Sequence, residues 1–238
     1  MRFMTAIAGA FLAALSLAPA TATATAAPEE PGMSPMIIGG SYASNFPYAA
    51  RLFVNGRENC SATKIAPTWI LTAEHCVASA GTYTFRAGSL DQTSGGQLVT
   101  GTQIIKHPSA DLALVRVGTS MSAPFSPLGT TSDVAVNQTV QLYGWGATCT
   151  NQPEINCQSR YLKVANTRVT SVNGSDYRGG VAIAVTRVDG IAAGGDSGGP
   201  MFASGKQVGV ASTSDRSSRS NYTAVTRYRS WIQQYAGV

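Results

Sequence analysis

The seven residues GGDSGGP, at positions 194–200, place four glycines and a proline around Asp196 and Ser197. Glycine weakens a strand or helix because ordering it costs more conformational entropy than ordering any other residue. Such a cluster is typical of a surface turn. It is also typical of a site where backbone N–H groups must approach a reacting atom without nearby side chains, and the remainder of the sequence distinguishes the two interpretations.

The composition indicates a β-rich globular protein with enough apolar residues for one large domain or two small ones. The 238 residues are 44% apolar and only 12% charged, and 25 of them are glycine. The net charge of +5 comes mainly from arginines that are scattered along the chain. A nucleic-acid-binding or basic surface-binding protein usually concentrates such residues in a block or patch, so no nucleic-acid partner is expected.

Residues 1–26 have the pattern of a secretory signal peptide. Arg2 supplies a positive start, the apolar run at 6–18 is too short to span a bilayer, and small residues precede the expected cleavage after Ala26. No later segment is apolar enough for a membrane helix, so we expect a secreted, extracellular product without a membrane partner. The acidic, proline-rich residues 27–36 are interpreted as a propeptide.

Export permits disulfide bonds, and the four cysteines allow three pairings. We favour the two local ones, Cys60–Cys76 and Cys149–Cys157. No C-x-x-C or histidine pair accompanies these cysteines, so the spacing does not predict a zinc site. Residues 85–100 contain a single acid, Asp91, and do not form an acidic calcium loop. No metal or other cofactor is expected.

From Ile37 onward, short extended runs alternate with turns. The stretch RLFVNGRENC (51–60) contains an Asn-Gly turn between two extended runs, which predicts a hairpin. Only the end of the chain, 228–238, has helical spacing. This pattern suits two antiparallel barrels better than alternating β-α units, with a linker at 122–133. The other expected strands cover 68–73, 112–117, 139–146, 180–188 and 207–213.

A serine such as Ser197 acts as a nucleophile when a base accepts its proton, and that base is usually a histidine oriented by a carboxylate. The two histidines, His75 and His107, both precede Ser197. The order Ser, acid, His of α/β-hydrolases, whose G-x-S-x-G pattern GDSGG also matches, is therefore excluded. The order His75, Asp111, Ser197 fits without strain, whereas the subtilisin order leaves His107 as the base.

The local sequence favours His75 over His107. His75 follows an extended run, and the adjacent Cys76 can tie its loop back to Cys60. Asp111 opens an apolar run, and a partly buried carboxylate there needs a partner such as a histidine N–H. His107 lies in a polar turn and is interpreted as a solvent-exposed side chain.

Five motifs stand in the order and approximate spacing found in the trypsin/chymotrypsin-like serine peptidases. They are IIGG (37–40), LTAEHC (71–76), DLALVRV (111–117), GWG (144–146) and GDSGGP (195–200). The chain resembles this family from Ile37 to its final helix, and its short propeptide and few cysteines resemble secreted bacterial members.

The resemblance implies an all-β fold of two six-stranded antiparallel barrels followed by a C-terminal helix. Residues 37–126 would form the first barrel, which carries His75 and Asp111, and residues 127–238 the second, which carries Ser197. The implied activity is that of a serine endopeptidase that cleaves proteins or peptides through an acyl-enzyme. His75 would be general base and then general acid, Asp111 would orient it, and the N–H groups of Gly195 and Ser197 would form the oxyanion hole.

The resemblance also implies activation by cleavage of the Met36–Ile37 bond. The freed α-amino group of Ile37 would insert beside Asp196 and order the oxyanion loop. A buried carboxylate without a cation is costly, so the cleaved terminus would act as a switch.

The specificity pocket departs from the trypsin pattern. The position six residues before the nucleophile, an aspartate in trypsins, is Ile191, and the usual pocket disulfide is missing. The small residues Ser214 and Ser220 align with the pocket walls. Ser212 would support Asp111, and Ser212, Thr213 and Ser214 would form the strand that pairs with the substrate backbone. We therefore expect a preference for the apolar P1 residues Phe, Tyr, Leu or Met.

Two alternatives remain at this stage. Asp189 or Asp215 could enter the pocket through a shifted loop, which would give trypsin-like cleavage after Arg or Lys. The second alternative is a non-catalytic binding protein with the same fold, because a fold does not determine a function. The expected partners are protein or peptide substrates, with protein inhibitors of proteases as further candidates, and the expected state is a monomer.

Overall fold

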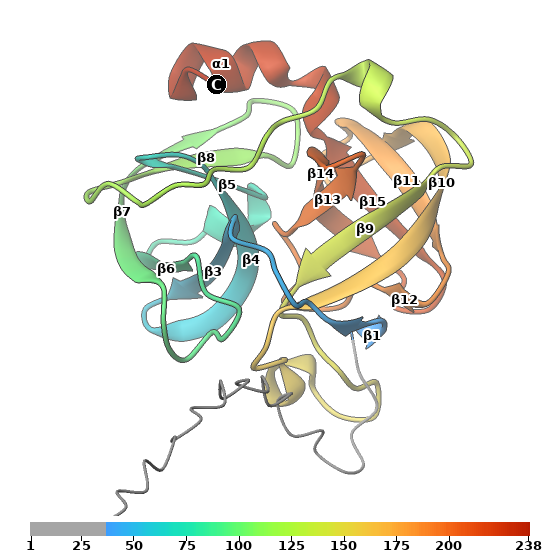
Figure 1. The fold of residues 1–238 in the computed structure, drawn as a ribbon, viewed down its shortest axis with the longest axis horizontal. Coiled ribbons are helices and arrows are strands. Elements are labelled where there is room, and N and C mark those ends of the chain that lie inside the picture. The colour runs from blue at the N-terminus through green and yellow to red at the C-terminus, as the bar shows by residue number, and fades with distance from the viewer. Residues whose placement is uncertain (1–36) are drawn as a thin grey trace, which may run out of the picture. The chain divides into compact units, whose positions relative to one another are not determined.

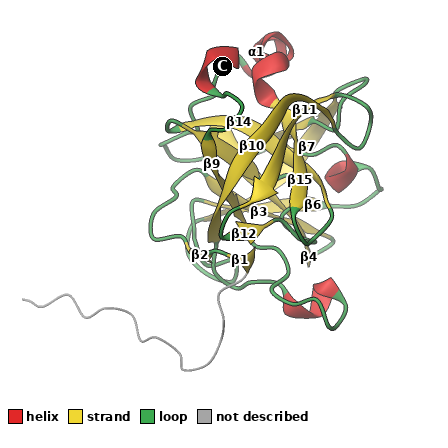
Figure 2. Ribbon diagram, turned by 90° about the vertical axis from the view of Figure 1, so that its right-hand side faces the viewer, coloured by secondary structure: helices red, strands yellow, loops and turns green. Residues whose placement is uncertain are grey.

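The computed structural model describes residues 37–238. The expected signal peptide (1–26) and propeptide (27–36) lie outside the described residues. Within them, strands dominate and form two barrels (Figures 1 and 2). None of the helices in this part of the chain is both long and apolar enough to cross a membrane.

The first barrel opens with the hairpin of β3 (Ala49–Val54) and β4 (Arg57–Ala66). Its turn residues Asn55 and Gly56 have φ angles of 52° and 76°, as a type I′ turn requires, so the Asn-Gly hairpin is confirmed. The barrel closes in the order β3-β4-β5-β8-β7-β6. Its other strands are β5 (Trp69–Thr72), β6 (Tyr83–Ala87), β7 (Gln97–Lys106) and β8 (Ala113–Val117).

The second barrel also has six antiparallel strands, in the order β11-β15-β14-β13-β9-β10, and the pairing of β10 with β11 closes it. The predicted fold class, two six-stranded barrels and a C-terminal helix, is therefore confirmed. The strands are β9 (Thr139–Gly144), β10 (Lys163–Ser175), β11 (Val181–Arg187), β13 (Pro200–Ala203), β14 (Lys206–Ser214) and β15 (Arg219–Ala224).

The first two strands belong with the second barrel, although the sequence placed residues 37–126 in the first. β1 (Ile38–Gly39) pairs with β12 (Gly190–Ile191), and β2 (Ser41–Tyr42) pairs with β10. Ile37 is buried, and the ammonium of Lys163 on β10 donates to the carbonyl of Gly39 at 3.0 Å. The start of the described chain is thus bound to the barrel that carries Ser197.

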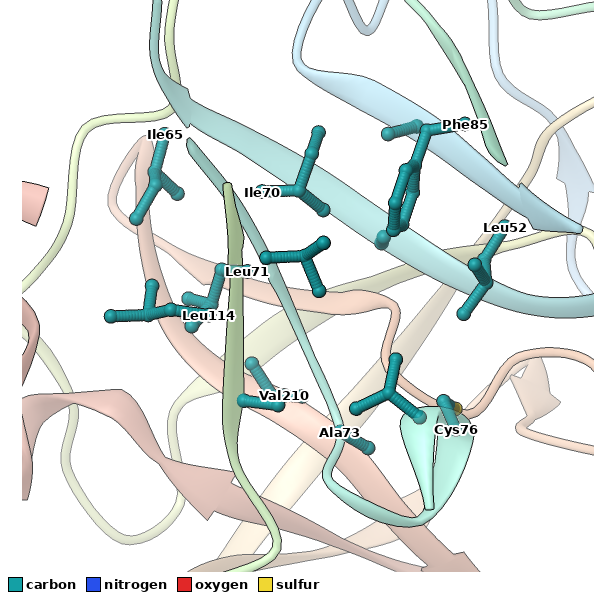
Figure 3. Close-up of a cluster of buried hydrophobic side chains, with 14 of the residues drawn as sticks. Leu52, Ile65, Ile70, Leu71, Ala73, Cys76, Phe85, Leu114 and Val210 are labelled. Atoms are coloured by element: carbon teal, nitrogen blue, oxygen red, sulfur yellow. The ribbon is translucent and has the colours of Figure 1, made fainter. Parts of the chain in front are cut away.

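The core of the first barrel receives side chains from the C-terminal half of the chain. Val210 of β14 lies among Leu71, Leu114 and their neighbours (Figure 3). Helix α1 (Arg229–Ala236) adds Ile232 to the same cluster, and Figure 1 shows α1 beyond the end of this barrel. Burying one such side chain contributes about 1.5 to 3 kcal/mol. These shared contacts fix how the two barrels meet.

Both favoured disulfides are present. Cys60 of β4 bonds to Cys76 of the short helix η1 (His75–Val77), and Cys149 bonds to Cys157. The first bond closes 16 residues and attaches the helix that begins with His75, whereas the second closes 8.

Replacing both Cys60 and Cys76 by alanine should lower the free energy of unfolding by about 3 kcal/mol, the size expected for a loop of this length. It should also lower activity, because the bond anchors η1. The double replacement of Cys149 and Cys157 should cost less on both measures. Urea unfolding and peptide hydrolysis check this, and equal losses for the two double variants would contradict it.

Candidate active site

His75 and Asp111 come together because their strands are neighbours. His75 follows β5 and Asp111 precedes β8, and these strands pair with Thr72 opposite Ala113. His75 Nδ1 lies 2.8 Å from Asp111 Oδ2, and the His75 backbone N–H donates to Asp111 Oδ1 at 3.0 Å. The carboxylate favours a proton on Nδ1, which leaves Nε2 as the ring nitrogen that can accept one.

Asp111 is fully buried and has three donors on its side chain. The third is the hydroxyl of Ser212, which donates to Asp111 Oδ2 at 2.6 Å. Burial by itself would raise the pKa of Asp111, but the hydrogen bonds from His75 and Ser212 outweigh burial and hold this pKa below its usual value. The ionised carboxylate can therefore orient the imidazole and stabilise its protonated form.

Ser197 shares a pocket of about 430 Å³ with His75. Of the residues expected to bind substrate, Ser212, Thr213 and Ser214 line this pocket. Ile191 and Ser220 do not, because they are 0% and 1% exposed within the second barrel. The remaining lining residues are Tyr177, Ala192, Ala193, Gly194, Ala211 and Arg216.

Gly195 has a backbone conformation that side-chain-bearing residues rarely adopt, with φ of +98°. A Cβ atom there would lie 1.9 Å from Gln158 Oε1. Its carbonyl accepts hydrogen bonds from Arg51 Nη1 at 3.0 Å and from Ser61 Oγ at 2.9 Å. Within residues 37–238 the N–H groups of Gly195 and Ser197 donate to no other residue, and Ser197 lines the pocket whereas Gly195 is buried directly beside it in the chain.

The loop that carries Ser197 packs directly on the first barrel. A Cβ atom at Gly198 would lie 2.1 Å from Thr72 Oγ1 and 2.4 Å from the carbonyl of Ser61. The Ser61 N–H donates to the carbonyl of Ser197 at 2.8 Å. The glycines of this motif therefore allow the Ser197 loop to approach the barrel that holds His75.

Asp196 is buried beside the GWG motif and does not itself line the pocket. Its carboxylate accepts hydrogen bonds from the N–H groups of Gly146 at 2.7 Å and Ala193 at 2.9 Å. A Cβ atom at Gly144 or Gly146 would overlap this carboxylate. Burial raises the pKa of Asp196 to about 6, although these bonds and the charges of Arg51 and Lys163 oppose the rise.

His107 is not the solvent-exposed histidine that the sequence suggested. Its ring packs half-buried against Tyr228 and Trp231, at centroid distances of 4.6 and 5.1 Å, and its Nδ1 accepts the N–H of Ala110. Burial first, and then the charge of Arg178, lower its pKa. His107 therefore joins α1 to the first barrel and does not line the pocket.

A metal site is not evident among these groups. In the described part of the chain, Cys60, His75 and Cys76 are the one cluster of potential metal-ligating atoms. The two sulfur atoms are already bonded to each other, so they are not available as thiolate ligands.

Sequence reasoning missed several residues that line the pocket. Ala192, Ala193 and Gly194 directly precede the GDSGGP motif, so their position along the chain was a usable signal. Tyr177 and Arg216 lie in turns whose packing depends on distant residues. Arg216, for example, is held by a bidentate ion pair with Glu154, at 2.6 and 3.2 Å.

Known proteins resemble this chain in sequence and in fold. The family described as Trypsin matches residues 37–232. Achelase-1 of Lonomia achelous is 30% identical over 84% of this chain and 100% of its own length, and trypsin alpha of Drosophila melanogaster is 29% identical over 85% and 88%. The structure of human heparin binding protein, 22% identical, covers 84% of this chain and 97% of its own with a TM-score of 0.73, a likeness of fold alone. The chain therefore belongs to the trypsin family and is a serine endopeptidase.

Proposed function

We propose that this protein is a secreted endopeptidase that cleaves peptide bonds through an acyl-enzyme on Ser197 and prefers apolar P1 residues. The observation that carries the proposal is the chain of contacts from Ser212 through Asp111 to His75, in a pocket that also holds Ser197. Its direct test is covalent labelling of the mature protein with a fluorophosphonate. A protein without an adduct on Ser197 would be the non-catalytic binding protein instead.

In this proposal, His75 Nε2 accepts the hydroxyl proton as Ser197 Oγ attacks the scissile carbonyl carbon. The imidazolium that forms is stabilised by Asp111, and its proton then passes to the leaving amine as the C–N bond breaks. Water repeats the sequence on the acyl-enzyme, with His75 again as the base. The chain supplies the acid, the base and the nucleophile of acylation, and water is the nucleophile of deacylation.

The negative charge on the substrate oxygen would be stabilised by the N–H groups of Gly195 and Ser197. One such donor lowers the barrier by about 3 kcal/mol when it is fixed in advance. The peptide unit that carries the Gly195 N–H is held through its Gly194 carbonyl, which accepts hydrogen bonds from the Ala147 N–H at 2.7 Å and from Gln158 Nε2 at 2.8 Å. Arg51 and Ser61 hold the next carbonyl, that of Gly195. Arg51 is fully buried, and burial lowers its pKa to about 10, so it is charged at neutral pH.

Apolar specificity is supported by what surrounds the pocket. Its lining includes three alanines and no carboxylate, and its charged member, Arg216, is paired with Glu154, so the lining residues offer a P1 lysine or arginine no ion-pair partner. Asp189 is occupied by Asn166, which donates its backbone N–H and its amide group at 2.7 and 2.6 Å. Asp215 accepts the N–H groups of residues 217, 218 and 219. Both carboxylates that could have given tryptic specificity are therefore bound elsewhere.

The same proposal includes activation by cleavage before Ile37. Residues 1–26 would be the signal peptide, and residues 27–36 the propeptide that this cleavage removes. Ile37 is buried where β1 meets β12, so this terminus already has a binding place on the second barrel. Asp196 lies fully buried, and none of the ion pairs among residues 37–238 includes it, although the charges of Arg51 and Lys163 lower its pKa. A new ammonium group at Ile37 would supply the missing partner.

Replacing Ser197 or His75 by alanine should each lower kcat by about four to six orders of magnitude, because the residues of such a triad act as a unit. His107→Ala is the matched control and should keep its activity per folded molecule. Hydrolysis rates per mole of folded protein, with folding checked by circular dichroism, test this. An inactive His107→Ala together with an active His75→Ala would show that the base is misassigned.

On a peptide library, substrates with P1 Phe, Tyr, Leu or Met should exceed those with P1 Arg or Lys by at least about tenfold in kcat/KM, because a lysine or arginine would be unpaired in this pocket. The same specificity allows cleavage after Met36. Ser197→Ala precursor, mixed with a trace of active enzyme, should therefore give the N-terminus Ile-Ile-Gly-Gly. A tenfold preference for Arg, or cleavage at another bond, would contradict this.

The raised pKa of Asp196 predicts a pH dependence of stability in the uncleaved chain. Between about pH 4, where an unfolded aspartate titrates, and pH 6, the folded chain binds more protons than the unfolded chain. Stability contributed by Asp196 is thus present at low pH and is lost as pH rises through this window, by roughly 2 to 3 kcal/mol.

The free energy of unfolding is measured between pH 4 and pH 6 by urea unfolding of the uncleaved Ser197→Ala protein, with and without Asp196→Asn. The difference between the two proteins isolates the contribution of Asp196 from that of the other carboxylates. This contribution should also disappear after cleavage before Ile37, when an ammonium group would lower the pKa of Asp196. An equal loss of stability with rising pH before and after cleavage would show that the new terminus does not reach Asp196.

A further inference from the structure

The pocket that holds Ser197 is lined by two separate segments of the chain. One is residues 192–194, directly before the GDSGGP motif, and the other is residues 211–214 with Arg216. A hydrogen bond joins them directly, because the Ser214 hydroxyl donates to the carbonyl of Ala192 at 2.5 Å. Neither segment contains a cysteine, so a disulfide cannot join them. Any further connection between the two has to come from a residue outside the lining.

Glu154 makes such a connection. It begins the short helix η3 (Glu154–Cys157), and its carboxylate accepts hydrogen bonds from Arg216 Nε at 2.6 Å and Nη2 at 3.2 Å. The same carboxylate lies against Gly194, where a Cβ atom would be 2.1 Å from Glu154 Oε2. The Arg216 guanidinium, and after it the Gly194 backbone N–H, hold the pKa of Glu154 below its usual value against the effect of burial. The ionised carboxylate thus contacts both lining segments.

The loop that carries Glu154 is fixed independently of Arg216. The Cys149–Cys157 disulfide closes this loop. Gln158 Nε2 donates to the carbonyls of Glu154 and Gly194, each at 2.8 Å, so the backbone of Glu154 is held beside Gly194. Arg216 therefore pairs with a carboxylate whose own backbone is already in place.

Arg216 carries a positive charge at the pocket, and its own turn orients the guanidinium. Nη1 donates to the Ser214 carbonyl at 3.1 Å, and the Arg216 backbone N–H donates to Ser214 Oγ at 3.0 Å. The edge formed by Nε and Nη2 meets the Glu154 carboxylate in a bidentate pair. An arginine recognises the carboxylate of a ligand in the same geometry. Glu154 therefore occupies the place that an acidic substrate side chain would take.

We propose that Glu154 is a specificity-determining residue, which excludes acidic P1 side chains by occupying the guanidinium of Arg216 and which joins the two lining segments of the pocket. The inference rests on the proposed function, since it concerns which P1 residue the acylation step accepts. With Glu154 in place, the charge of Arg216 is balanced, and an apolar P1 side chain meets a lining without an unpaired charge. The Arg216 side chain is 52% exposed, so without Glu154 it would stay charged and accessible, and a P1 glutamate would become its partner.

The test compares the wild-type enzyme with Glu154→Gln and with the double variant Glu154→Gln/Arg216→Gln, on peptides that differ only in a P1 residue of Phe or Glu. Glutamine keeps the shape of the glutamate side chain and removes its charge. In Glu154→Gln, the ratio of kcat/KM for P1 Glu to that for P1 Phe should rise about fivefold, mainly through KM, which is the scale of one partly exposed ion pair. The rise should shrink in about 1 M NaCl, because salt screens such a pair, and should disappear in the double variant.

Lys206→Gln is the matched control, because it removes the ion pair of Lys206 with Asp133 at 2.9 Å, and neither residue lines the pocket. Its ratio should equal that of the wild type. An unchanged ratio in Glu154→Gln, or a rise that persists in the double variant, would overturn the proposal. Equal losses on both peptides would assign Glu154 to structure alone and would overturn it as well. A wild-type enzyme that takes no fluorophosphonate label on Ser197 would instead refute the proposed function.

Discussion

The loop around Ser197 contacts both barrels at once, and the hydrogen bonds of Ser61 make this contact. The Ser61 N–H donates to the carbonyl of Ser197, and its hydroxyl donates to the carbonyl of Gly195 and accepts the N–H of Trp145. The His75 side of the site and the Ser197 side are thus linked through hydrogen bonds on one residue of β4. Any side chain at Gly198 would separate them, since it would overlap Ser61 and Thr72.

Charged groups are buried around this contact, and each is matched by polar partners. Asp111 and Asp176 lie back to back, joined through the N–H of Asp111, and Asp196 is held by two backbone donors. Arg51 binds Gln92, Gln158 and the Gly195 carbonyl. Burying charges is costly unless their hydrogen bonds are satisfied, so this network stabilises one arrangement of the site over alternatives in which a group is left unpaired.

Asp196 differs from Asp111 and Asp176 because both of its hydrogen-bond donors are backbone N–H groups. Burial raises its pKa to about 6, and burial also lowers the pKa of the neighbouring Lys163 to about 8. The Lys163 ammonium donates to the Gly39 carbonyl, and this hydrogen bond attaches β1 to β10. The position of the chain start and the charge balance of the Ser197 loop are therefore connected through one lysine, next to the bond whose cleavage we propose.

Local chemistry determined much of this protein from the sequence alone. The Asn55-Gly56 hairpin follows from the φ angles that its turn needs, and the disulfides join cysteines that are near in sequence. The position of both histidines before Ser197 excludes the α/β-hydrolase order. The helical spacing near the C-terminus predicted α1. Each of these features depends on residues close together along the chain, or on their order.

Features that depend on pairing between distant segments were decided only by the tertiary structure. Strand β1 pairs with β12, whose residues lie about 150 positions later in the chain, in a two-stranded sheet apart from the first barrel. His107 is half-buried against α1, Ile191 is buried and does not line the pocket, and Tyr177 lies near His75 because its turn is bonded to Asp111 and Ser212. A sequence pattern shows that a side chain is polar or apolar, but the neighbour it meets is set by how the two barrels pack, since that packing decides which distant backbone groups lie within hydrogen-bonding distance.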